Sequence, residues 1–214
     1  MTISVLIADD HTILAEALSY VLQAQADIKV VAHAINGRSA IRKTEELRPD
    51  VVLMDVLMPE LNGIEATRAI REQMKEVQVV VLTAFSSPDH IVRAVRAGAR
   101  GFVVKRAKCI DLIDAIHTVN HGRTYFDRSI PQAVIAKAFH ANMTNDLLDL
   151  LSLRERHVLQ LVVEGKSATE IARSLSLSPK SVETYRSRMR QKLNLRTLPE
   201  LVKFAIRNGL TTLD

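Results

Sequence analysis

Pro49-Asp-Val-Val-Leu-Met-Asp-Val-Leu-Met-Pro59 is the segment from which the rest of the chain can be understood. Its apolar run Val51–Met54 is bounded by prolines and too short for a helix, which predicts a strand buried on both faces of a parallel sheet. Asp55 stands at the carboxyl end of that strand. Ligands of open α/β sheets bind outside the carboxyl ends of the strands, so Asp55 is a candidate site residue. Taken alone, it would more readily be interpreted as an aspartate that caps a loop, but other residues accompany it.

Strand-like and helix-like segments alternate over the first 120 residues. The predicted strands are 3–8, 29–33, 51–55, 77–83 and 101–105. The predicted helices are 13–22, 37–48, 63–72, 88–97 and 110–119. Five strand–helix repeats of this length indicate parallel pairing with right-handed crossovers. The fold class predicted for this part is therefore α/β, with a doubly wound, five-stranded parallel sheet.

Length and composition limit the class of protein. With 214 residues, 47% of them hydrophobic and no Trp, the chain fits one large or two ordinary helix-rich domains. A single cysteine, Cys109, excludes an internal disulfide and a cysteine-based zinc cluster, and suits a reducing cytosol. The first residues lack the features of a signal peptide, and no apolar run approaches the roughly 18 residues of a membrane span. We expect a soluble, cytoplasmic protein without a membrane partner.

Positive charge is concentrated in the last third of the chain. Residues 146–214 hold 12 Lys and Arg against 8 Asp and Glu, which is +4 of the total net charge of +5. This asymmetry indicates a phosphate-rich partner for the C-terminal part. A solvated basic face would give the same numbers, so charge alone hardly separates the two readings.

Polar residues stand at the ends of four predicted strands. They are Asp9, Asp10, Asp55, Thr83 and Lys105. Because the carboxyl ends of parallel strands meet at one edge, three carboxylates would come close together, and a bound divalent cation would relieve their repulsion. Oxygen ligands of this kind suit Mg²⁺ with a phosphate as its other partner. The ammonium and the hydroxyl could hold phosphoryl oxygens, and a carboxylate can become an aspartyl phosphate.

Five short motifs resemble the receiver domain of bacterial response regulators, which is flavodoxin-like. They are Leu6-Ile-Ala-Asp-Asp-His11, Met54-Asp-Val-Leu-Met-Pro59, Leu61-Asn-Gly63, Val81-Leu-Thr-Ala84 and Gly101-Phe-Val-Val-Lys105. The resemblance covers residues 1–120. It implies that Asp55 accepts a phosphoryl group from the phosphohistidine of a sensor kinase. It also implies that Asp10, Asp55 and the backbone carbonyl of Leu57 hold Mg²⁺, with Asp9 helping through water.

The same resemblance gives roles to the other residues at this edge of the sheet. Thr83 and Lys105 would bind the phosphoryl oxygens, and Phe102 would be the aromatic switch that rotates with Thr83. Many family members carry Tyr there, so Phe102 keeps the bulk but loses a hydroxyl hydrogen bond. His11 could complete an Asp-Asp-His metal trio, but the preferred reading is a solvated residue at a helix start. Cys109 is expected to be a small buried apolar residue.

Residues 121–146 are predicted to be a linker. Gly122 and Pro131 interrupt the pattern, and residues 142–146 have the composition of a loop. Gln132–His140 could form one short helix within this linker.

Residues 147–214 are predicted to form a small all-α domain. Ser152 can cap a helix that carries Glu155 at its third position, which is a capping box. Ser167 caps a short second helix, and Ser178 caps a third. A short helix, a tight turn and a longer helix with a polar face are the organisation of a helix-turn-helix.

The third helix, which runs to about Leu193, has two distinct faces. Val182, Met189 and Leu193 form the predicted buried stripe. A second face carries Lys180, Glu183, Thr184 and Ser187, and a basic flank carries Arg186, Arg188, Arg190 and Lys192. A small helical bundle with a solvated charged face is the alternative, but it leaves the basic cluster on this one helix unexplained.

This region resembles the LuxR-type DNA-binding domain. The motifs are Leu151-Ser-Leu-Arg-Glu155, Glu170-Ile-Ala172, Leu177-Ser-Pro-Lys-Ser-Val-Glu-Thr-Tyr185 and Lys192-Leu193. With the receiver, the whole chain resembles a NarL/FixJ-type response regulator. The resemblance implies that Glu183, Thr184 and Ser187 face base edges, and that Tyr185 belongs to the DNA-binding surface. It implies phosphate contacts for Lys180, Ser181, Arg186, Arg188 and Lys192. The Glu183 carboxylate would accept from a cytosine amino group and repel the backbone.

The function expected from these features is a transcription regulator that binds double-stranded promoter DNA and is switched at Asp55 by a sensor histidine kinase. It would be no enzyme apart from phosphoryl self-transfer and slow loss of the phosphoryl group. Leu57 and Phe85 flank the phosphoryl position and are too apolar to orient water. One alternative is an aspartate-nucleophile phosphatase, although such enzymes usually place an acid where Leu57 stands. The other is a DNA-binding regulator that works without phosphorylation.

A homodimer on DNA is also expected. The last helix, predicted over 200–208, carries an apolar stripe of Leu201, Phe204 and Ala205. The domain needs only part of that stripe for its own core, so the remainder would pair two copies on two related half-sites.

Overall fold

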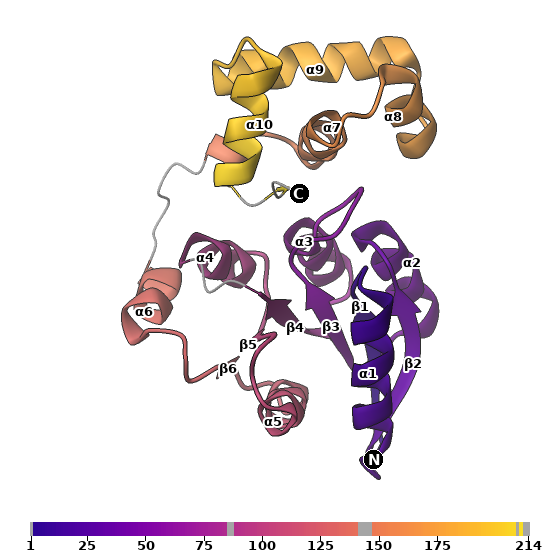
Figure 1. Ribbon diagram of the computed structural model, residues 1–214, viewed down its shortest axis with the longest axis vertical. Helices are drawn as coiled ribbons and strands as arrows, with labels where there is room; N and C mark the ends of the chain where they lie inside the picture. The colour runs from indigo at the N-terminus through magenta and orange to yellow at the C-terminus, as the bar shows by residue number, and fades with distance from the viewer. Residues whose placement is uncertain (1, 85–87, 141–146, 209, 212–214) are drawn as a thin grey trace. The chain divides into compact units, whose positions relative to one another are not determined.

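The computed structural model describes residues 2–84, 88–140, 147–208 and 210–211 (Figure 1). The chain divides into two compact units, residues 1–141 and residues 142–214, and each is described by itself. Among the described helices, none is both long enough and apolar enough to cross a membrane.

A six-stranded parallel sheet forms the centre of the first unit, in the order β2-β1-β3-β4-β5-β6. The strands are β1 (Ile3–Ala8), β2 (Ile28–Ala34), β3 (Val51–Asp55), β4 (Gln78–Thr83), β5 (Gly101–Val104) and β6 (Tyr125–Phe126). The prediction of five strands was wrong by one, because β6 is added beside β5. Two residues are too few to show any strand periodicity in the sequence.

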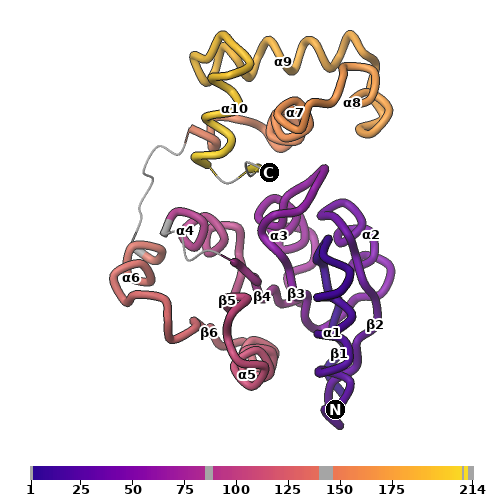
Figure 2. Tube along the Cα trace, viewed as in Figure 1, coloured from indigo at the N-terminus to yellow at the C-terminus, as the bar shows by residue number. Residues whose placement is uncertain are grey.

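Helices cover both faces of this sheet (Figures 1 and 2). They are α1 (Thr12–Gln23), α2 (Gly37–Leu47), α3 (Gly63–Gln73), α4 (Pro88–Arg96), α5 (Cys109–Asn120) and α6 (Gln132–His140). Residues of α1 and α5 share one core cluster with the sheet, and residues of α2, α3, α4 and α6 share the other. Both faces of the central strand β3 are therefore buried, as its apolar run predicts.

The segment predicted as a linker contributes to the first unit. Its helix α6 is present and packs along α4, with Val134 and Ala138 buried. An exposed ion pair joins Lys137 Nζ to Asp89 Oδ1 of α4 at 3.2 Å. The first unit thus extends about 20 residues beyond the predicted boundary at residue 120.

Gly63, the first residue of α3, allows a close approach of two backbones. Its N–H donates to the carbonyl of Val56 at 2.9 Å, and an added Cβ would lie 1.8 Å from the carbonyl oxygen of Asp55. A backbone carbonyl beside the site cannot move aside as a flexible side chain can, so glycine is required there.

We expect Gly63→Ala to lower the free energy of unfolding of the first unit by about 3 kcal/mol or more, because the extra methyl overpacks a filled site. Gly122→Ala is the matched control. Its φ is +74° and nothing lies within 4 Å of the added Cβ, so it costs only the backbone strain of about 1–2 kcal/mol. Urea unfolding of both variants measures the difference. Equal losses would show that the contact with Asp55 is not limiting.

The second unit is helical: η1 (Leu147–Leu150), α7 (Leu153–Val163), α8 (Ala168–Leu175), α9 (Pro179–Leu193) and α10 (Leu198–Arg207). The predicted caps at Ser152, Ser167 and Ser178 are confirmed, the first two as capping boxes. The predicted stripe of α9 is buried in one core shared by α7, α8 and α10. The helix-turn-helix organisation is therefore present.

Candidate functional site

Two buried carboxylates lie where the strand order of the sheet reverses. Asp9 follows β1, and Asp55 is the last residue of β3. These two strands are neighbours, and the order in which strands are added to the sheet reverses between them. Their exposed fractions are only 1% and 3%. Carboxylate oxygens of Asp9, Asp10 and Asp55 and a ring nitrogen of His11 all lie within 4.8 Å of one another. The three acids thus lie close together at one edge of the sheet, as predicted.

Lys105, which follows β5, neutralises part of this charge. Its Nζ lies 2.8 Å from Asp9 Oδ2 and 2.9 Å from Asp55 Oδ2. Burial alone would lower the pKa of Lys105, but the carboxylates of Asp55 and Asp9 outweigh it and raise that pKa. The backbone N–H of Lys105 donates to the carbonyl of Thr83 at 2.8 Å, which ties the ends of β4 and β5 together. The structure therefore brings all five strand-end residues to one rim.

The balance of charged groups in the pocket favours binding of a cation. Burial raises the pKa of Asp55 to about 6, and the charges of Asp9 and Asp10 add to that effect, while Lys105 opposes it. One ammonium faces three acids, and every candidate ligand atom of the acids is an oxygen. This donor set fits Mg²⁺, which binds through one or two carboxylates and keeps several waters. Leu57 lies two residues beyond Asp55, in the loop after β3, at the same rim.

His11 is the N-cap residue of α1, and its side chain is largely exposed, as the preferred reading expected. Its Nδ1 nevertheless lies 3.0 Å from Asp9 Oδ1 and 3.1 Å from Asp10 Oδ1. The ring thus braces the two carboxylates from the solvent side. For Cys109 the prediction was wrong, because this first residue of α5 is exposed.

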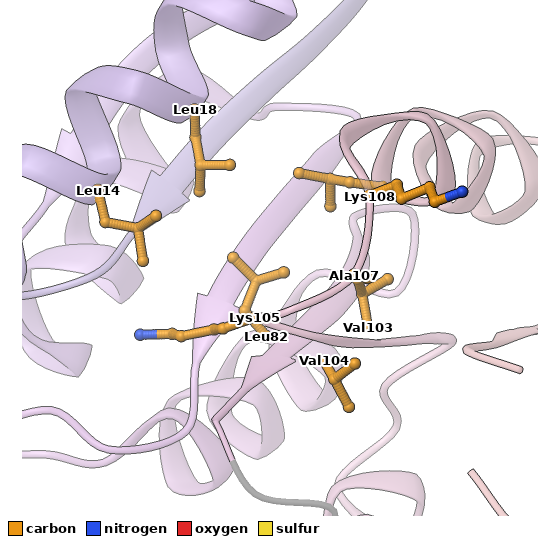
Figure 3. A pocket seen from close by; sticks show the side chains of 9 residues that line it. Leu14, Leu18, Leu82, Val103, Val104, Lys105, Ala107 and Lys108 are labelled. Atoms are coloured by element: carbon orange, nitrogen blue, oxygen red, sulfur yellow. The ribbon is translucent and has the colours of Figure 1, made fainter. Parts of the chain in front are cut away.

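An apolar hollow lies beside Lys105, between α1 and α5 (Figure 3). Its lining consists of Leu14, Leu18, Leu82, Val103, Val104, Lys105, Ala107, Lys108 and Leu112. The aliphatic stem of Lys105 runs along this hollow, and its ammonium points away from that of Lys108. Because the walls beside the stem are apolar, the ammonium of Lys105 pairs with the carboxylates instead. This pairing favours the extended side chain seen here.

Thr83 and Phe102 are both buried in the first unit. The ring of Phe102 does not reach the surface but stacks on Phe126 of β6. Phe85, the second residue predicted to flank the phosphoryl group, lies outside the described residues.

One face of α9 is solvent-exposed and polar, opposite the stripe of Val182, Met189 and Leu193. It carries Lys180, Glu183, Thr184, Ser187, Arg188 and Gln191. Gln191 was missed by the sequence reading, although its spacing of four from Ser187 and seven from Thr184 would have placed it on this face. Glu183 Oε1 accepts from Arg186 Nη1 at 2.9 Å, so the carboxylate and a guanidinium are held side by side.

Three residues predicted to contact DNA have partners within the unit. Tyr185 is half-buried against the core, and the hydroxyl of Ser181 lies 2.8 Å from that of Ser178 in the helix cap. Lys192 Nζ donates to Oε2 of Glu155 in α7 at 2.7 Å. A pairing over 37 positions leaves no local signal in the sequence.

The predicted dimer stripe on α10 needs correction. Leu201 and Ala205 are fully buried in the core of their own unit, and Phe204 is partly buried against it. These side chains hold α10 onto α7, so Leu201 and Ala205 cannot also face a second copy. The small domain uses more of the stripe for itself than the sequence reading allowed.

Comparison with known proteins agrees with this geometry. Residues 5–117, more than half of the chain, match the response regulator receiver domain. Residues 149–205 match the bacterial regulatory proteins of the luxR family. The chain belongs to the response regulators. It is of the NarL/FixJ type and functions as a DNA-binding transcription regulator of a two-component system.

Relatives with both units are similar over nearly the whole length of this response regulator. The oxygen regulatory protein NreC of Staphylococcus carnosus is 35% identical over 96% of this chain and 98% of its own. The response regulator GacA of Pseudomonas viridiflava is 36% identical over 97% of each chain.

Solved structures give the same result for the fold. A LuxR-family response regulator from Aurantimonas sp. SI85-9A1 is 30% identical, with a TM-score of 0.61 over 65% of this chain and all of its own. RcsB of Salmonella enterica serovar Typhimurium, solved on promoter P1flhDC with BeF3⁻, has a TM-score of 0.61 over 95% of this chain and 98% of its own. At 24% identity, RcsB shows the fold alone.

Proposed function

We propose that Asp55 is the phosphoacceptor of this response regulator and that its phosphorylation by a sensor histidine kinase controls binding to promoter DNA. The observation that carries the proposal is a nearly buried carboxylate at the switch point of the sheet with an ammonium 2.9 Å away. This arrangement provides both a nucleophile and a fixed positive charge for the phosphoryl oxygens.

In the transfer step, an Asp55 oxygen forms a bond to phosphorus while the bond from phosphorus to the kinase histidine nitrogen breaks. The electron pair of the broken bond stays on that nitrogen. Lys105 stabilises charge on the phosphoryl oxygens, and the Thr83 hydroxyl would be the second group to hold them. Asp9, Asp10, Asp55 and the carbonyl of Leu57 would hold Mg²⁺. When bound, Mg²⁺ supplies charge neutralisation that the single ammonium cannot provide for three carboxylates and a phosphoryl group.

The exposed face of α9 is proposed to enter the major groove of double-stranded DNA. Glu183, Thr184 and Ser187 would face base edges, and Lys180, Arg186 and Arg188 would meet phosphates. Residues 149–205 match the bacterial regulatory proteins of the luxR family, which supports this use of the unit in the present protein. The protein is also proposed to bind two half-sites as a homodimer, through residues other than Leu201 and Ala205. A footprint that protects a single half-site at saturation would contradict it.

The test is to incubate the full chain with Mg²⁺ and a small phosphodonor. We expect an acid-stable, base-labile adduct on the wild type and none on Asp55→Asn. The matched control is Asp50→Asn, because Asp50 is an exposed aspartate directly before the first residue of β3. This variant should form the adduct as the wild type does. An adduct that survives Asp55→Asn would refute the assignment.

The same reaction separates the two alternatives. Steady release of inorganic phosphate without an adduct would favour a phosphatase. A stable adduct that leaves the affinity for promoter DNA unchanged would favour a regulator that works without phosphorylation.

A further inference from the structure

Three phenylalanine rings form a continuous contact from β5 to α6. Phe102 of β5 stacks on Phe126 of β6, with ring centroids 4.8 Å apart and planes 6° from parallel. Phe126 in turn meets Phe139 of α6 edge to face, with centroids 5.9 Å apart. Phe102, the position expected to be the aromatic switch, is therefore linked to α6 through Phe126.

The backbone locks this stack in register. Phe102 and Phe126 are directly paired in the parallel ladder of β5 and β6. The N–H of Tyr125 donates to the carbonyl of Arg100 at 2.9 Å, and the N–H of Asp127 donates to the carbonyl of Phe102 at 2.8 Å. Turning the Phe102 ring to the surface would consequently break the stack on Phe126 unless β6 moved as well.

Packing along α4 and the contact of Phe139 with Phe126 hold α6 in place. Its nine residues bury Val134 and Ala138, and its ion pair from Lys137 to Asp89 is exposed and thus worth little. A helix of this length is not stable in water by itself. The docked form of α6 therefore depends on these tertiary contacts, and the aromatic stack is the contact that links it to β5.

The same strand reaches the phosphoacceptor pocket. Three residues after Phe102, Lys105 contacts Asp55, and its N–H is bound to the carbonyl of Thr83. The docked form seen here is also the form in which Lys105 is placed for a phosphoryl group. If the stack were lost, this end of β5 would lose one of the supports that keep Lys105 there.

We propose that Phe126 is a positioning residue for Phe102, so that docking of β6 and α6 and occupation of the pocket at Asp55 stabilise each other. This inference rests on the proposed phosphoacceptor role of Asp55. Such coupling is reciprocal: whatever factor docking contributes to ligand affinity, the ligand contributes to docking.

The first test needs no substitution. The full chain is compared with and without Mg²⁺ and beryllofluoride, an analogue of the phosphoryl group, by amide hydrogen exchange. We expect the α6 amides to exchange about tenfold more slowly in the complex, within the roughly 5–150-fold range of allosteric couplings. Unchanged or faster exchange of α6 in a complex that has formed would overturn the inference and leave the role of Asp55 intact. Failure of the wild type to bind beryllofluoride would overturn both.

The second test measures beryllofluoride affinity in variants by ¹⁹F NMR. Phe126→Leu keeps an apolar side chain but loses the flat ring, and should bind about tenfold more weakly with no slowing of α6 exchange. Phe126→Tyr keeps the ring and should stay within about twofold of the wild type. Tyr20→Leu removes an exposed ring of α1 and is the matched control. Equal affinity of Phe126→Leu and Tyr20→Leu would refute a positioning role.

Discussion

Replacing Lys192 with Met is expected to destabilise the DNA-binding unit by about 1–3 kcal/mol, the usual cost of removing one partner from a buried polar group. Glu155 is 3% exposed and accepts from the N–H of Ser152 at 2.7 Å, from its hydroxyl at 3.0 Å and from Lys192 Nζ at 2.7 Å. Without the ammonium, the carboxylate keeps its cap but loses its counter-charge. Amide exchange across α7 and α9 in the full chain should then be about 5–150-fold faster.

The pH dependence of this loss has a definite sign. Burial alone would raise the pKa of Glu155, but hydrogen bonds from Lys192 and Ser152 outweigh it and hold that pKa below its usual value. A depressed pKa stabilises the folded state above the unfolded-state value of 4.5 and ceases to do so as pH falls through the folded value. In Lys192→Met, the lowering of the Glu155 pKa by Lys192 is lost and only the hydrogen bonds from Ser152 still oppose burial, so that pKa rises relative to the wild type. The deficit of the variant should therefore be largest near pH 7 and shrink toward pH 4.

Two further variants separate charge burial from simple loss of a side chain. Adding Glu155→Gln to Lys192→Met removes the unpaired charge and should recover part of the stability. Arg188→Met on the exposed face of the same helix is the matched control and should stay within about 0.5 kcal/mol of the wild type. A Lys192→Met variant as stable as Arg188→Met would show that the pair in the structure contributes nothing.

DNA binding distinguishes a phosphate contact from a positioning role for Lys192. Each phosphate contact contributes about −0.9 to the slope of log K against log salt on double-stranded DNA. Arg188→Met should therefore reduce the steepness of that slope by about 1. Lys192→Met should weaken binding through the loosened α9 but leave the slope unchanged. A reduced slope in Lys192→Met would support the phosphate contact that the resemblance to the LuxR-type domain implies.

The sequence predicted what depends on local pattern and missed what depends on pairing over distance. Apolar runs such as Val51–Met54 alternate along the chain with amphipathic segments, and this pattern is enough to specify strands and helices. Because the carboxyl ends of parallel strands meet at one edge of the sheet, Asp9, Asp55 and Lys105 are brought together. The caps at Ser152 and Ser178 follow from their immediate neighbours. These features need no knowledge of tertiary contacts.

Other features could not be obtained in this way. The two residues of β6 become a strand only because β5 offers an edge, and the stack of Phe102 on Phe126 follows from that pairing. Lys192 looks like its basic neighbours until Glu155 is found beside it. The apolar stripe that contains Leu201 would have the same periodicity whether it packed on its own domain or on a second copy. The sequence of a helix face does not indicate which partner covers it.

Leu57→Asn is expected to shorten the lifetime of the phosphorylated protein by about tenfold or more. An acyl phosphate is lost when water attacks in line, and a group that orients that water is typically worth about 10²–10⁴ in rate. Leu57 lies two residues after Asp55 and is partly buried against the core cluster on the α3 side of the sheet, so its apolar side chain can cover the phosphoryl group but cannot orient water. An amide there supplies a donor and an acceptor.

The measurement follows decay of the radiolabelled adduct on Asp55 in wild type, Leu57→Asn and Leu57→Met. The Met variant is the control, because it keeps an apolar cover of similar volume and should decay at the wild-type rate. Faster decay in both variants would mean that the shape of the cover matters more than its hydrogen-bonding groups. Equal lifetimes in all three would show that Leu57 does not control access of water. Slow loss in the wild type would leave termination of the signal to another protein, since neither the ammonium of Lys105 nor the hydroxyl of Thr83 is a base toward water.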